Sequence, residues 1–162
     1  MSDTAPILVI AYGNLSRGDD AVGPQLAARL EAWLAERGEK RIEVLSDFQL
    51  NIEHALDFIG RRRVLLMDAK QGGDAPFSCV PVLPVADSSI STHTLSPGAL
   101  LEIYRSLRWA DPPPVELLSI PGSCFELGAA LSPEVSEYIE SAWVYLKAWC
   151  LAAAAKAEVG HA

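Results

Sequence analysis

Residues 6–23, PILVIAYGNLSRGDDAVG, decide the fold. Their first part, Pro6 to Tyr12, is a nearly continuous apolar run with β-branched members, which is typical of a strand buried on both faces of a sheet. A polar turn with glycines follows, and a helical pattern then runs from about Asp20 to Arg37. A buried strand, a tight turn and a helix predict the first unit of a parallel α/β sheet.

The same alternation continues along the chain. Further strands are predicted at 41–48, 63–69, 79–85 and 115–120, and helices at 52–59, 97–108 and from Ser132-Pro133 to the alanine-rich end near Gly160. In the 52–59 helix we expect the inward side chains to be Ile52, Ala55, Leu56 and Ile59. Pro81 and Pro84 place the 79–85 strand at a sheet edge.

These elements predict a three-layer α/β/α sandwich with a central, mostly parallel (mixed) sheet of about five strands. We expect one domain over residues 1–162, with flexible tails at about 1–5 and 158–162. In such sheets a ligand site lies beyond the carboxyl ends of the strands.

The composition excludes several classes of protein. The chain has 162 residues and a net charge of −8, from 13 Lys+Arg against 21 Asp+Glu, which argues against binding to nucleic acid or to an anionic membrane surface. No apolar run approaches the roughly 20 residues that span a bilayer. The three cysteines form no C-x-x-C and predict free thiols, and the start lacks a basic signal region. We expect a cytoplasmic monomer.

Polar residues that can carry chemistry follow the strand-like segments. Asp19 and Asp20 follow the first strand and its turn, Asp68 ends the run beginning at Val64, and His93 lies just before the helix that opens at Ser96-Pro97. If these strand ends are neighbours, two carboxylates and an imidazole meet in one crevice. Such oxygen and nitrogen ligands suit a divalent transition metal such as nickel or zinc.

Each of these residues also has a simpler interpretation. Asp19 or Asp20 could cap the first helix, and a single histidine in a loop is more often a surface residue. Asp68 is harder to dismiss, since a carboxylate at the end of a buried strand is costly unless it is paired. His54 is expected to face solvent.

The turn at residues 13–18 is not a phosphate loop. It matches neither G-x-G-x-x-G nor G-x-x-x-x-G-K-[ST], and two aspartates at the helix start would repel phosphate. Ser16 is not in G-x-S-x-G, so a hydrolase nucleophile is not expected there. Cys124 could pair with His93 as a nucleophile, but without a local signature a structural thiol is favoured.

The segment from Gly13 to Gly23 resembles the N-terminal signature of the [NiFe]-hydrogenase maturation endopeptidases, a strand followed by G-N-x-L-x-x-D-[DE]-x-x-G and a helix. The resemblance spans roughly residues 7–150 and includes Asp68 and His93 in the family's order. The segments most similar to the branch serving cytoplasmic, NAD(P)-linked bidirectional hydrogenases are Arg17-Gly18-Asp19-Asp20, Asp47-Phe48-Gln49-Leu50 and Phe125-Glu126-Leu127-Gly128.

The resemblance implies a protease that removes a C-terminal extension from the hydrogenase large-subunit precursor after nickel has been inserted. It implies that Asp20, Asp68 and His93 contact nickel supplied by the precursor, with Asp20 where many relatives have Glu. Asp20 and Asp68 are the expected catalytic carboxylates, and Asp19 is expected as a helix cap or a partner of the ligands. Gly13, Asn14, Gly18 and Gly23 form the turn.

One segment departs from the family pattern. Many relatives carry D-G-G-T-x-G after the second strand, where this chain has Asp47-Phe48-Gln49-Leu50-Asn51, so we expect a different substrate cleft. Two other functions stay open. The same ligands would serve a non-catalytic nickel-sensing assembly chaperone for the large subunit, and a similar sheet could carry another small hydrolase or a phosphorylase.

Overall fold

The structure is a computed structural model, and it describes residues 3–86 and 95–159. Five strands form one sheet: β1 (Ile7–Tyr12), β2 (Ile42–Asp47), β3 (Arg63–Gln71), β4 (Ser78–Val82) and β5 (Val115–Gly122). A single turn of 3-10 helix, η1 (Gly18–Ala21), precedes the first of the helices α1 (Val22–Arg37), α2 (His54–Asp57), α3 (Pro97–Arg108) and α4 (Pro133–Val159).

The strand order is β2-β1-β3-β5-β4. All pairs are parallel except β4 with β5, which is antiparallel. The predicted mostly parallel, mixed sheet is therefore confirmed, and the strand with Pro81 does lie at an edge, where a residue without an amide hydrogen is tolerated. In the described ranges, no helix has the length and apolar character to span a bilayer.

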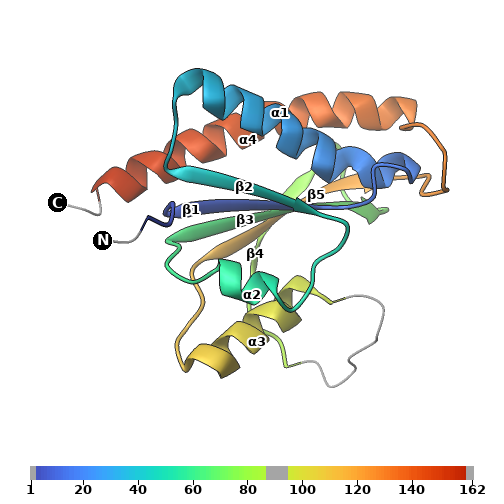
Figure 1. Ribbon diagram of the computed structural model, residues 1–162. Coiled ribbons are helices and arrows are strands. Elements are labelled where there is room, and N and C mark those ends of the chain that lie inside the picture. The colour runs from blue at the N-terminus through green and yellow to red at the C-terminus, as the bar shows by residue number, and fades with distance from the viewer. Residues whose placement is uncertain (1–2, 87–94, 160–162) are drawn as a thin grey trace.

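Alternate residues of β1 supply two separate cores, because successive side chains of a strand point to opposite faces. Ile7, Val9 and Ala11 pack with buried residues of α1 and α4, and Leu8 and Ile10 pack with Phe58 and the buried residues of α3. Figure 1 shows the corresponding layers, with α1 and α4 on one side of the sheet and α2 and α3 on the other. The three-layer prediction is confirmed.

This arrangement creates a crevice between β1 and β3. The connection from β1 to β2 runs through α1 on one face, whereas the connection from β2 to β3 runs through α2 on the opposite face. After β1 the chain continues to β2 at one edge of the sheet, and after β3 it continues to β4 at the other edge, so it leaves the carboxyl ends of these neighbouring strands in opposite directions. Ligands of open α/β sheets bind at such a switch point.

The helix predicted at 52–59 is shorter than expected and buries a different face. It spans only His54–Asp57, and Ile52 and Leu56 are 59% and 64% exposed, whereas His54, Ala55 and Phe58 are buried. The prediction of inward Ile52 and Leu56 is wrong, because one turn of helix is too short for apolar periodicity to define its buried face. The prediction that His54 faces solvent is also wrong, because His54 is buried.

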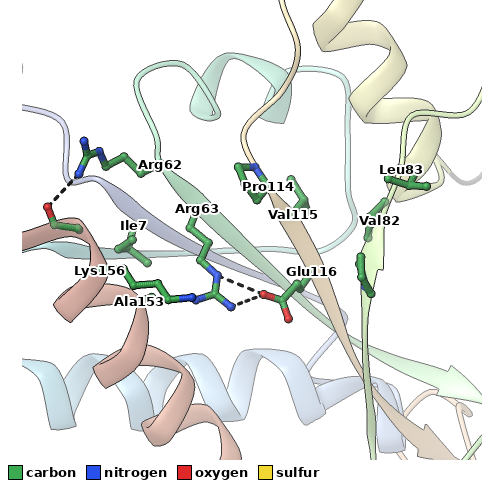
Figure 2. A pocket seen from close by; sticks show the side chains of 12 residues that line it. Ile7, Arg62, Arg63, Val82, Leu83, Pro114, Val115, Glu116, Ala153 and Lys156 are labelled. Carbon is green, nitrogen blue, oxygen red and sulfur yellow. Dashed lines mark hydrogen bonds and ion pairs between the residues drawn. The ribbon is translucent and has the colours of Figure 1, made fainter. Parts of the chain in front are cut away.

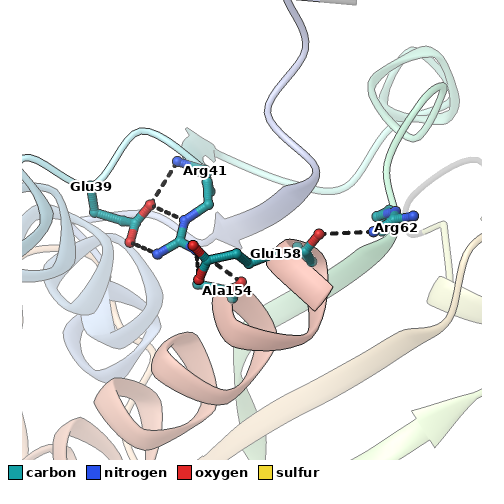
Figure 3. A network of polar contacts seen from close by, with 6 residues as sticks. Glu39, Arg41, Arg62, Ala154 and Glu158 are labelled. Atoms are coloured by element: carbon teal, nitrogen blue, oxygen red, sulfur yellow. Dashed lines mark hydrogen bonds and ion pairs between the residues drawn. The ribbon is translucent and has the colours of Figure 1, made fainter. Parts of the chain in front are cut away.

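Polar contacts attach the end of α4 to the amino end of the sheet (Figure 3). Arg41, just before β2, donates to Glu39, to Glu158 and to the carbonyl of Ala154, and Arg62 donates to the carbonyl of Ala157. Glu158 is 77% exposed at its side chain, so its ion pair adds at most about 1 kcal/mol. The contacts lie far from the carboxyl ends of β1 and β3 and serve to hold α4 in place.

The corrected assignment around α2 can be tested with neighbouring substitutions. Phe58→Ala should lower the free energy of unfolding by about 3–5 kcal/mol, because Phe58 is fully buried and its removal leaves a cavity. Leu56→Ala, the matched control, should change it by less than about 0.5 kcal/mol. Both values come from urea unfolding, and a larger loss for Leu56→Ala than for Phe58→Ala would contradict the assignment.

Candidate active site

The centre of the site is a row of polar side chains across three adjacent strands. In the sheet register Met67 lies opposite Ala11 and Asp68 lies opposite Ser119, so Tyr12, Asp68 and Ser119 share one face. The Tyr12 hydroxyl donates to Asp68 Oδ2 at 3.1 Å, and the Ser119 hydroxyl donates to Asp68 Oδ1 at 3.0 Å. Asp68 lies within β3 rather than at its end, since the strand continues to Gln71.

Asp68 has an unusual pKa for an aspartate. Burial raises it most, the hydrogen bonds from Ser119 and Tyr12 and the charge of Lys70 oppose that rise, and the charge of Asp20 adds to it, so that the pKa reaches about 6. The Tyr12 pKa is also raised, by burial first and then by the Asp68 charge, so its hydroxyl stays protonated as a donor. A carboxyl with a pKa of about 6 can exchange a proton near neutral pH.

Asp20 reaches the same crevice from the turn after β1. Its Oδ2 accepts a hydrogen bond from the Asn14 amide at 2.6 Å. Gly13 has a φ of +154°, and a Cβ at this position would overlap the Asp20 carbonyl oxygen. A Cβ on Gly23 would lie 3.1 Å from the carbonyl oxygens of Tyr12 and Met67, so α1 begins directly against β1 and β3. The predicted turn residues therefore set how closely Asp20 approaches the strand ends.

Asp19 does not cap α1, and neither does Asp20, since no side chain caps that helix. Instead, the fully buried Asp19 carboxylate accepts hydrogen bonds from the amides of Ser123, Cys124 and Ser132 at 2.8, 3.0 and 2.7 Å, and from the Ser132 hydroxyl at 2.7 Å. Burial raises its pKa, but these bonds together outweigh burial and lower it. Asp19 thereby joins the turn after β1 to the β5–α4 connection.

Gly18 supports the same junction. It has a φ of +54°, and a Cβ there would overlap the carbonyl oxygen of Cys124, which accepts a hydrogen bond from the Asp19 amide at 2.8 Å. The Ser16 carbonyl accepts a hydrogen bond from the Gly128 amide at 2.7 Å. The turn is therefore held on the loop after β5 by backbone contacts.

Asp20 and Asp68 open into one cleft of about 350 Å³. Its walls come from the turn after β1, from β3, from the segment after β2 and from the start of α3; they are formed by Tyr12, Gly13, Asp20, Phe48, Gln49, Leu50, Asp68, Ala69, Leu95 and Pro97. Phe48 is 74% exposed and Leu50 is buried in the core. The segment that departs from the family pattern thus forms a wall beside the two carboxylates.

A larger cavity of about 550 Å³ lies at the opposite end of the sheet (Figure 2). It is lined by the first residues of three parallel strands, Ile7, Arg63 and Val115. Arg63 and Glu116 in its lining are paired within the fold: Arg63 donates to Glu116, which also accepts from Trp149 Nε1 at 3.1 Å. The smaller cleft, with Asp68 and its raised pKa, is therefore the better candidate for chemistry.

Two of the three predicted nickel-contacting residues, Asp20 and Asp68, come together in this cleft. The third, His93, lies outside the described residues. Among the described residues, no group of three or more His, Cys, Asp or Glu side chains is arranged to hold a metal ion. The sequence interpretation missed Tyr12 and Ser119, whose place beside Asp68 becomes visible only when the strand register is known.

Comparisons with known proteins support the fold. No family model matches the sequence, and no curated protein does so significantly. Several solved structures, by contrast, are similar to this chain. The [NiFe] hydrogenase maturation protease HycI of Thermococcus kodakarensis is similar with a TM-score of 0.65 and 21% identity, covering 88% of this chain and 90% of that chain.

Two structures from Escherichia coli are also similar. The hydrogenase maturating endopeptidase HybD has a TM-score of 0.65 and 22% identity, covering 86% of this chain and 88% of its own. A second endopeptidase, determined in solution, has a TM-score of 0.67 and 22% identity, covering 93% of each chain. The protein therefore has the fold of hydrogenase maturation endopeptidases over most of its length.

The structural role of Asp19 predicts a loss of stability in Asp19→Asn. The amide would place a donor group against backbone donors, and the free energy of unfolding at pH 7 should fall by about 2–4 kcal/mol. Because folding lowers the Asp19 pKa, its contribution is present above the ordinary value of 3.8 and is lost as the pH falls further. Urea unfolding between pH 7 and pH 3 should show the difference from wild type narrowing below about pH 3.8. An equal loss in the exposed control Asp74→Asn would contradict this role.

Asp68→Asn should have the opposite effect on stability. A carboxyl whose pKa is raised by folding costs stability when it ionises, so wild-type stability should fall as the pH rises from 3.8 through about 6. The amide removes that dependence and should be more stable than wild type at pH 7 by roughly 1–3 kcal/mol. Unfolding measured across this pH range tests the expectation, and a variant that keeps the wild-type pH dependence would refute it.

Proposed function

We propose that this protein is an endopeptidase that removes the C-terminal extension of a nickel-loaded [NiFe]-hydrogenase large-subunit precursor. The observation that carries the proposal is the cleft that holds Asp20 and Asp68 at the β1/β3 switch point. It occurs on a fold shared with proteins described as hydrogenase maturation proteases. The acidic chain, with a net charge of −8, suits a cationic centre and not nucleic acid.

Nickel enters this scheme with the substrate. Two carboxylates and the His93 imidazole make an incomplete coordination set, which nickel held by the precursor's thiolates would complete. Docking would then depend on whether the precursor carries its metal. Nickel would act as a docking point that orients the peptide, or would also polarise the scissile carbonyl.

Asp68 is the better candidate for the general base. Its pKa of about 6 lets it take a proton from a water molecule as the water oxygen attacks the scissile carbonyl. The same carboxyl would then return the proton to the leaving amine as the peptide bond breaks. Tyr12 and Ser119 hold its two oxygens in place. Asp20, beside the Asn14 amide, would serve mainly as a metal-contacting group.

The wall formed by Phe48, Gln49 and Leu50 would bear on which precursor is accepted. The resemblance of this segment favours the branch that serves cytoplasmic, NAD(P)-linked bidirectional hydrogenases. In this proposal the enzyme is a cytoplasmic monomer, and its partner is the folded precursor. Specificity then comes from docking a folded protein rather than from reading an extended peptide.

Mass spectrometry of a large-subunit precursor incubated with the protein, with and without nickel, tests the proposal. Wild type should shorten the nickel-loaded precursor by the mass of its C-terminal extension and leave the nickel-free precursor intact. Tight binding of the loaded precursor without any loss of mass would instead favour the non-catalytic assembly chaperone. Cleavage of generic peptides without nickel would favour another hydrolase.

Substitutions at the two carboxylates sharpen that experiment. Asp68→Asn should slow cleavage by about 10²–10⁴-fold, the usual effect of removing a general base. Asp20→Asn combined with His93→Ala should abolish nickel-dependent cleavage, because two of the three proposed contacts are lost. Glu31→Gln, at an exposed carboxylate on α1, is the control and should cleave at the wild-type rate. Normal cleavage by the double variant would refute the proposed site.

A further inference from the structure

Residues 47–51 run from the last residue of β2 toward α2, and specific contacts must fix the shape of this segment. It places Phe48 and Gln49 on the wall of the cleft, and Phe48 is 74% exposed, so little packing holds that side chain in place. Leu50 is only 4% exposed and anchors one point of the segment in the core. The remaining constraint must come from polar contacts.

His54, the first residue of α2, supplies two of those contacts. His54 is 6% exposed, and its Nδ1 accepts a hydrogen bond from the Asn51 amide at 2.9 Å. A nitrogen that accepts must carry a lone pair, so the ring proton of the neutral imidazole lies on Nε2. Nε2 is 3.5 Å from Asp47 Oδ2. A single ring therefore contacts both ends of the segment.

The Asp47 carboxylate makes two further hydrogen bonds within segment 47–51. Its Oδ1 accepts from the Phe48 amide at 2.7 Å, and its Oδ2 accepts from Asn51 Nδ2 at 3.3 Å. The Asp47 carbonyl in turn accepts from the Gly13 amide at 3.0 Å, in the turn that carries Asp20. The wall residues are thus fixed relative to the carboxylates through Asp47, and Asp47 and Asn51 are held together by His54.

We propose that His54 is a positioning residue that holds segment 47–51 closed, so that Phe48 and Gln49 form a preorganised wall for the substrate. The inference rests on the proposed function. His54 is not one of the residues that line the cleft, so it acts on substrate binding through the wall and not on the proton transfer. Loss of the Nδ1 contact should raise KM for the precursor about five- to tenfold, the effect of one hydrogen bond, with kcat nearly unchanged.

Two amide variants separate positioning from general stability. His54→Asn places an acceptor oxygen near the position of Nδ1 and should keep KM within about threefold of wild type. His54→Gln places its amide nearer to Nε2, leaves the Asn51 amide without its acceptor, and should show the full rise in KM. Glu53→Gln, at the exposed neighbouring position, is the control and should match wild type. Equal effects of His54→Asn and His54→Gln would overturn the inference.

A double-mutant cycle tests whether His54 acts through the wall. Phe48→Ala removes an exposed side chain of that wall and should raise KM by itself. If His54 works by placing Phe48, adding His54→Gln to Phe48→Ala should raise KM by less than twofold more. Fully additive effects would mean that His54 acts by some other route, and would overturn the inference.

Hydrogen exchange by NMR gives a readout that does not depend on cleavage. The Asn51 amide should be protected in wild type and in His54→Asn, and should exchange at least tenfold faster in His54→Gln. The ¹⁵N shifts of the His54 ring should place the proton on Nε2. If wild type fails to cleave the precursor but these signatures appear, the proposed function fails and the positioning role stands. If wild type cleaves and Asn51 exchanges equally fast in all variants, the positioning role fails alone.

Discussion

The buried Asp19 carboxylate is the constraint on which the site depends. Its four hydrogen bonds come from Ser123, Cys124 and Ser132, and they join the turn after β1 to the connection between β5 and α4. A buried carboxylate is costly unless such donors surround it, so the chain gains stability only when both segments adopt this arrangement. Asp20, the next residue, lines the cleft and accepts a hydrogen bond from the Asn14 amide. The close approach of Gly18 to the Cys124 carbonyl follows from the same junction.

Two aspartates in one region, Asp19 and Asp68, differ in pKa because their surroundings differ. Asp19 is surrounded by donors, and its pKa is lowered. Asp68 accepts hydrogen bonds from two hydroxyl groups. Burial raises its pKa by more than these bonds lower it, and the pKa rises to about 6. Environments that separate the pKa values of neighbouring carboxyl groups are typical of sites that divide structural and acid–base roles. The proposed function uses this difference, since it assigns a structural role to Asp19 and proton transfer to Asp68.

The sequence was sufficient for the features that depend on local patterns. Apolar runs predicted the strands, and the rule for open α/β sheets predicted that Asp20 and Asp68 would meet. It was insufficient where the outcome depends on register or on distant partners. Tyr12 and Ser119 meet Asp68 only because of how β1, β3 and β5 align, and Asp19 bonds to residues more than a hundred positions away. His54 was misassigned to the surface because one turn of helix carries too little periodicity to define a face.

We propose that the carboxylates of this cleft recognise a metal carried by the partner protein. The most direct measurement is the affinity for nickel-loaded and nickel-free precursor, taken by stopped-flow anisotropy before cleavage proceeds, with wild type and with Asp20→Asn. The account predicts that wild type binds the loaded precursor at least tenfold more tightly, and that Asp20→Asn loses most of that preference while its affinity for nickel-free precursor is unchanged. Equal affinity of wild type for the two forms would contradict it.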